Sequence, residues 1–174
     1  YEPDIAEEDY QREGICYVLI STTGLRDADG NLTPFTDEEV QERTQMAEEL
    51  SQKAKETGNL KSVAEEAGLR PIESSMGRSN EGDGQEPLML DAARALAVGE
   101  VSNPIETEEG WFLVQHTSDY DESGTVYWKE YLTEQAQQSY AQEIYEQWRA
   151  NAQIVQNEEI MESVIVKDVL KELL

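Results

Sequence analysis

The stretch ALAVGEVSNPIETEEGWFLVQHTS, residues 95–118, decides the fold of this chain. It begins as the small-residue end of a helix that stops at Gly99, and it continues into a short strand over about 101–106 that carries Pro104. A polar turn follows, and an apolar strand then runs over about 111–117. This order of helix, strand, turn and strand predicts the closing part of a small antiparallel sheet.

The upstream half predicts the rest of the sheet and its helices. Residues 15–21, ICYVLIS, form an apolar run of strand length that is rich in β-branched side chains. Thr36 and Glu39 have the spacing of a capping box at the start of a helix predicted over 37–57, which Gly58 ends. The other predicted elements are a turn region that starts at Thr22, a short helix over 60–68, a strand over 69–76, a polar loop over 77–87 and a helix over 88–96.

The C-terminal part of the sequence is of a different kind. A long helix with many aromatic residues is predicted over 126–152, and a final helix or strand–helix segment over 157–174. We therefore divide the chain into a lead-in arm, 1–14, a domain over 15–119 and a C-terminal helical segment, 120–174. The predicted fold class of the central domain is α+β, with helices packed on a small antiparallel sheet.

Composition narrows the possible functions. The 174 residues include 38 acidic and 13 basic ones, which gives a net charge of −25. Such a charge repels nucleic acid and anionic membrane surfaces, and it attracts basic, unfolded polypeptides. No apolar run reaches the roughly 20 residues that cross a bilayer, so we expect no membrane insertion by this segment. The single cysteine, Cys16, excludes an internal disulfide and a multi-cysteine metal site, and the single histidine, His116, cannot supply a histidine-rich one.

The residues around the opening stretch resemble the closing half of a parvulin-type peptidyl-prolyl isomerase domain. The resemblance is strongest over 92–114, in the strings VGEVSNPI and GWFLV. ICYVLIS is similar to the first strand of that family, and residues 37–68 are similar to its first two helices. The remaining C-terminal part is similar to the tail of extracytoplasmic foldases of the PrsA and SurA kind, in which a helical chaperone module flanks the parvulin domain.

The resemblance implies a fold and an activity. It implies a parvulin-like sheet and peptidyl-prolyl cis–trans isomerase activity on unfolded, proline-containing polypeptides. It implies no cofactor, and it implies an extracytoplasmic location. Because the chain begins at Tyr1 rather than Met, we expect a processed or trimmed piece whose targeting signal lies upstream. The prediction requires the first and last strands to lie side by side and to wall an apolar hollow for a proline ring.

The alignment with the family also assigns five site residues. Tyr17 and Phe112 fall where active parvulins usually carry histidines, which makes them the candidate catalytic positions. Met89 falls where the family often has phenylalanine, and Leu88 and Leu113 are the other candidates for substrate binding. Since neither family histidine is present, we expect weak or absent isomerase activity together with a retained peptide groove.

Several alternatives remain open at this stage. Tyr17 and Phe112 are either substrate contacts or core aromatics, and Met89 belongs either to the groove or to the core. His116 is interpreted as an exposed residue at the end of a strand. Two functions are alternatives to an isomerase. One is a noncatalytic peptide-binding chaperone with a degenerate parvulin domain, and the other is a helical assembly module that forms a homodimer through 126–174.

Overall fold

The computed structural model describes residues 1–26, 29–78 and 84–152. Contacts divide the chain into two compact units, Tyr1–Gln135 and Ala136–Leu174. The sheet, the first four helices and the start of the last helix belong to the first unit. The helices and strands are α1 (Glu7–Tyr10), β1 (Glu13–Ser21), β2 (Gly24–Arg26), β3 (Leu32–Pro34), α2 (Asp37–Thr57), α3 (Leu60–Glu66), β4 (Ile72–Met76), α4 (Pro87–Arg94), β5 (Ile105–Thr107), β6 (Gly110–Ser118) and α5 (Glu122–Asn151).

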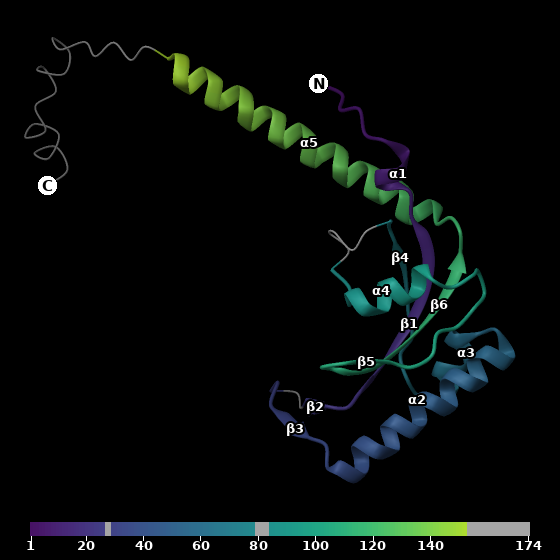
Figure 1. The fold of residues 1–174 in the computed structure, drawn as a ribbon. Helices are drawn as coiled ribbons and strands as arrows, with labels where there is room; N and C mark the ends of the chain where they lie inside the picture. The colour runs from purple at the N-terminus through teal and green to yellow at the C-terminus, as the bar shows by residue number, and fades with distance from the viewer. Residues whose placement is uncertain (27–28, 79–83, 153–174) are drawn as a thin grey trace, which may run out of the picture. The chain divides into compact units, whose positions relative to one another are not determined.

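Strands β4, β1, β6 and β5 form, in that order, a four-stranded antiparallel sheet. Because side chains alternate along a strand, the central strands supply apolar residues to both faces. On one face, Val18, Ile20 and Leu113 pack with residues of α2 and α3. On the other face, Ile15 and Phe112 pack with residues of α4 (Figure 1). The predicted α+β class with a small antiparallel sheet is confirmed.

Helix α2 follows the local signals in its sequence. The Thr36 hydroxyl accepts a hydrogen bond from the Glu39 backbone N–H at 3.3 Å, and the Glu39 carboxylate accepts one from the Thr36 N–H at 2.8 Å. This reciprocal capping box satisfies two N–H groups that the first turn leaves without partners. The helix ends at Gly58, whose φ of 65° is in the left-handed region that glycine adopts without strain. The predicted bounds, 37–57, are confirmed.

Two parts of the sheet prediction need correction. The predicted turn region contains a hairpin, in which β2 pairs with β3. Its strands are three residues each, and Leu25 and Leu32 are 64% and 42% exposed, so no alternating pattern marks them. The strand expected near 101–106 is interrupted, since Val101 makes an isolated bridge to Gln115 and pairing resumes only at Ile105. Pro104, between them, has no N–H to donate.

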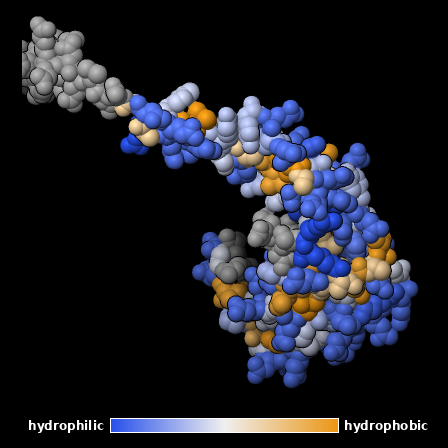
Figure 2. Space-filling view, turned by 45° about the horizontal axis from the view of Figure 1, so that its top comes forward, coloured by the Kyte–Doolittle hydropathy of each residue, from blue (hydrophilic) through white to orange (hydrophobic). Residues whose placement is uncertain are grey.

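The remaining predictions concern boundaries, the tail and the surface. Helix α5 starts at Glu122, four residues before the predicted helix, and the segment 157–174 lies outside the described residues. No helix among the described residues is long and apolar enough to cross a membrane. Hydrophilic residues dominate the face drawn in Figure 2, as expected from the net charge of −25.

Candidate functional site

The α4-facing side of the sheet carries the candidate isomerase residues. Alternate positions of β1, including Ile15 and Tyr17, lie on this face, and so do Phe112 and Val114 of β6. Their apolar side chains pack against α4 in one cluster. Its fully buried members from the flanking elements are Met76, Met89, Leu90 and Ala93.

Tyr17 and Phe112, the two candidate catalytic positions, are in ring contact. Their centroids lie 6.2 Å apart, with the planes inclined at 50°. Phe112 is 7% exposed, whereas Tyr17 is half-buried. Burial raises the pKa of the Tyr17 hydroxyl above its ordinary value, so it remains a neutral donor at physiological pH. In the described part of the chain no hydrogen bond engages that hydroxyl, which leaves it available to a ligand.

The three candidate substrate-binding residues are not together. Met89 lies in the α4-facing cluster with no exposed surface, and Leu88, next to it, is 55% exposed. Leu113 is fully buried on the opposite face, among residues of α2 and α3, because it follows Phe112 directly in β6. The structure therefore brings Tyr17, Phe112 and Met89 together and places Leu113 across the sheet.

The open apolar hollow expected between the first and last strands is occupied by the protein's own side chains. Met76, Met89 and Leu90 have no exposed surface, and Phe112 has almost none. These side chains fill the space because α4 packs directly onto β6. Of the candidate residues on this side, Tyr17 and Leu88 retain accessible surface. A ligand on this face would contact these two side chains first.

An open pocket adjoins Leu88. It is lined by Glu86, which precedes α4, by Leu88 of α4, and by residues of β5 and the turn that follows it, Glu106, Thr107, Glu108 and Glu109. One Glu86 carboxylate oxygen accepts a hydrogen bond from the Leu88 N–H at 3.3 Å, which caps the start of α4. The sequence predicts only a polar turn after β5, because nothing in the local sequence indicates that its glutamates face α4.

His116 is buried, so the prediction of an exposed strand-end residue is wrong. The residue is 5% exposed, with Nδ1 of its ring 2.9 Å from the Leu96 carbonyl oxygen and Nε2 3.1 Å from the Ser118 carbonyl oxygen. Nε2 also lies 3.3 Å from a carboxylate oxygen of Glu13. The segment after α4 and the start of β1 cover a position that the strand alone would leave exposed. The histidine links these segments.

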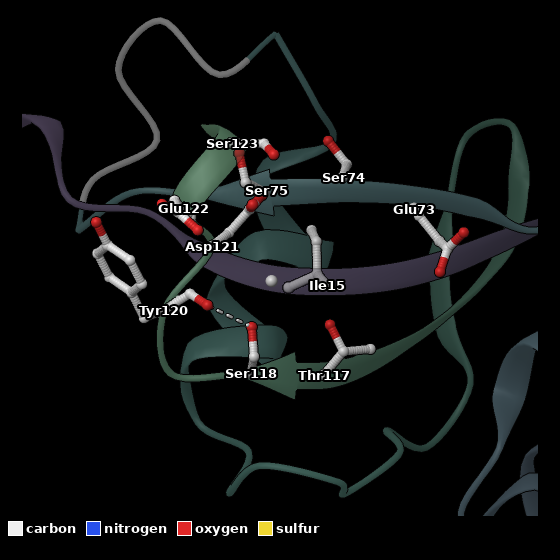
Figure 3. Close-up of a pocket in the computed structure, with 11 residues that line it drawn as sticks. Ile15, Glu73, Ser74, Ser75, Thr117, Ser118, Tyr120, Asp121, Glu122 and Ser123 are labelled. Atoms are coloured by element: carbon white, nitrogen blue, oxygen red, sulfur yellow. Dashed lines mark hydrogen bonds between the residues drawn. The ribbon is translucent and has the colours of Figure 1, made fainter. Parts of the chain in front are cut away.

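A second pocket lies over the end of the sheet where β1 begins (Figure 3). Hydroxyl and carboxylate groups line it, and Figure 3 shows them along β4 and β6 and around the start of α5, with Ile15 of β1 between the two strands. Ser118 donates a hydrogen bond to the Tyr120 carbonyl oxygen at 2.9 Å across its edge. None of the five candidate residues lines it. Within the described residues no cluster of histidine, cysteine and carboxylate side chains could hold a metal ion.

The four-stranded antiparallel sheet with helices on both faces is the fold expected of a parvulin-type rotamase domain. A family model for the PPIC-type PPIASE domain of rotamases matches residues 19–118. The match covers more than half of the 174 residues, and the chain belongs to this family. No curated protein matches the chain.

Solved structures of PrsA proteins are similar to this chain. The peptidylprolyl isomerase PrsA from Bacillus cereus is 20% identical with a TM-score of 0.32, and the match covers 87% of this chain and 54% of that one. PrsA from Bacillus subtilis is 21% identical with a TM-score of 0.30, and the match covers 92% of this chain and 61% of that one. The chain thus spans 54% and 61% of the lengths of these two structures.

Proposed function

We propose that this chain is a parvulin-type foldase domain that binds proline-containing segments of unfolded polypeptides and isomerises them slowly. Because the hollow between the strands is filled, the proposed contacts are made over the accessible side chains of Tyr17 and Leu88. The observation that carries the proposal is the match to the PPIC-type isomerase family over 19–118. The contact between Tyr17 and Phe112, at the positions that we align with the family histidines, supports it. We propose the boundaries 1–14, 15–119 and 120–174 for the arm, the isomerase domain and the helical segment.

Slow turnover is expected because one of the two polar contacts to the rotating amide is missing. Rotation about an amide bond has a barrier of about 18–20 kcal/mol that comes from resonance, and no covalent bond has to break. A protein lowers the barrier by binding the twisted amide better than either planar form. The Tyr17 hydroxyl can donate one hydrogen bond to such an amide, whereas Phe112 offers no polar atom. The site thus keeps one of the two polar contacts that the family histidines would supply and loses the other.

A noncatalytic peptide-binding chaperone is the second candidate function. The position of His116 favours it, because both ring nitrogens of the chain's only histidine lie within hydrogen-bonding distance of backbone carbonyl oxygens. This histidine is therefore engaged in the fold rather than free for a substrate. The domain would then hold extended segments without accelerating their isomerisation.

The clients, the location and the assembly of the protein are part of the proposal. The clients are unfolded polypeptides outside the cytoplasm, which a net charge of −25 helps to attract when they are basic. A homodimer through 126–174 remains an alternative role for the C-terminal part. Exposed aromatics at the start of this segment, with Tyr127 at 65% and Tyr131 at 41%, support that alternative. Light scattering on the chain and on a version cut after residue 122 would test it.

An NMR titration tests the proposed function. A tetrapeptide with one proline is added to ¹⁵N-labelled protein, and exchange between its cis and trans signals is measured in the same samples. We expect shifts at Tyr17 and Leu88 with weak exchange cross-peaks. Shifts without cross-peaks would favour the noncatalytic chaperone. The absence of any shift would rule out peptide binding on this face.

A further inference from the structure

We infer that the α4-facing side of this domain selects proline segments with lysine or arginine next to the proline. The inference rests on the proposed function and adds a substrate class to the same site. It starts from the pocket beside Leu88, whose lining residues are one leucine, one threonine and four glutamates. No lysine or arginine lines this pocket.

The four glutamates have no ion-pair partner among the described residues, whereas some other carboxylates of the domain are paired. Lys53 pairs with Glu66 at 2.6 Å, and Arg78 pairs with Glu8 at 2.6 Å. Within residues 1–26, 29–78 and 84–152, no such ion pair engages any of the pocket glutamates, Glu86, Glu106, Glu108 and Glu109. The mutual repulsion of neighbouring carboxylates in the pocket is relieved when a cation binds among them.

The pocket combines this charge with an apolar contact. Leu88 is 55% exposed, and its neighbour Met89 belongs to the same buried cluster as Phe112. Ile105, at the start of β5, pairs directly with Phe112 of β6. The acidic turn follows the end of β5, so it continues from the strand that lies next to Phe112. A peptide bound at Tyr17 and Leu88 would therefore place a flanking side chain near the carboxylates. The stem of lysine or arginine would cover Leu88, and the charged end would reach the glutamates.

The expected preference is moderate and depends on salt. Ion pairs at an exposed surface contribute little each, and salt screens them. Several carboxylates attract the lysine side chain of one peptide and repel the glutamate side chain of another. Together these effects should give about a tenfold difference in affinity between the two peptides at low salt. At about 0.5 M salt the difference should shrink to about twofold or less.

Three tetrapeptides that differ only before the proline, Ala-Lys-Pro-Phe, Ala-Gln-Pro-Phe and Ala-Glu-Pro-Phe, test the inference. Dissociation constants from NMR shifts are measured with the full chain at about 20 mM and about 500 mM salt. We expect the order lysine, glutamine, glutamate at low salt, with shifts at Leu88. Equal affinities for all three peptides would overturn the inference while leaving the proposed function intact. If none of the three binds, the proposed function itself fails.

Matched variants separate the pocket from the overall charge of the protein. Glu108→Gln with Glu109→Gln removes two pocket carboxylates and leaves Glu86, which caps α4, in place. Glu42→Gln with Glu48→Gln removes two exposed carboxylates of α2, far in sequence from the pocket, and changes the net charge equally. We expect the first pair to reduce the lysine preference by about threefold and the second to leave it unchanged. An equal effect of both pairs would assign the preference to net charge and would overturn the inference.

Discussion

Val18 on β1 pairs directly with Leu113 on β6 in the centre of the sheet. The two side chains share the face that α2 and α3 cover, and both are buried, at 1% and 0% exposure. Their strand neighbours, Tyr17 and Phe112, consequently share the opposite face and meet in ring contact. One register thus fixes both the main core and the candidate isomerase positions.

Restoring the family histidines should raise isomerase activity. In a Tyr17→His and Phe112→His double variant, two polar side chains replace a pair whose centroids lie 6.2 Å apart. The accessible ring at position 17 can then hydrogen-bond to the twisted amide while the buried ring at position 112 orients it, so we expect at least about a tenfold increase in kcat/KM. The protease-coupled assay with a proline tetrapeptide measures it. A folded double variant with unchanged activity would contradict the role assigned to these positions.

Removal of the Thr125 hydroxyl should destabilise the domain. Thr125 is 5% exposed, and its oxygen accepts a hydrogen bond from the Arg12 backbone N–H at 3.0 Å. Thr125→Val keeps the shape and removes the acceptor of this buried hydrogen bond, at a cost of about 1–3 kcal/mol. Thr133→Val is the control, because the Thr133 hydroxyl is exposed and bonds within its own helix. Urea unfolding would show similar losses for both variants if the buried bond were unimportant.

The Cys16 thiol should be unreactive in the native protein. It is 2% exposed, and its pKa is raised from 9.0 to about 11, first by burial and then by the nearby charge of Glu73. A raised acid pKa favours the neutral thiol, so at pH 8 the thiolate fraction should be about a hundredfold lower than in the unfolded chain. Modification by a disulfide reagent, followed from pH 7 to pH 10 with and without denaturant, measures this. Equal rates under both conditions would disprove it.

Gly110 should tolerate no side chain. Its φ is 139°, and an added Cβ would lie 2.3 Å from the Ile20 carbonyl oxygen of β1. Gly110→Ala combines backbone strain with a clash in the sheet, so we expect a loss of about 3 kcal/mol or more in unfolding free energy. Gly58→Ala is the matched control, because Gly58 has a φ of 65° with open space around it and should lose only about 1 kcal/mol. Comparable losses in urea unfolding would contradict the clash.

The sequence by itself determined those features that depend on neighbouring residues. The capping box at Thr36, the end of α2 at Gly58 and the apolar runs of β1 and β6 involve contacts between residues a few positions apart. Such contacts need no knowledge of the rest of the chain. The family resemblance was carried by the same local strings, and the match over 19–118 confirms it.

Only the tertiary structure decided which residues far apart in the sequence are in contact. Gln115 shows the difference, because its side chain donates to the carbonyl oxygens of Gly58 and Gly99 and accepts from the Leu60 N–H. These partners lie 57, 16 and 55 positions away, and no local pattern connects them. The burial of His116, the separation of Leu113 from Phe112 and the acidic pocket at Leu88 are of the same kind. Each depends on which helix surfaces pack against which strands, and this is determined only when helices cover both faces of the complete sheet.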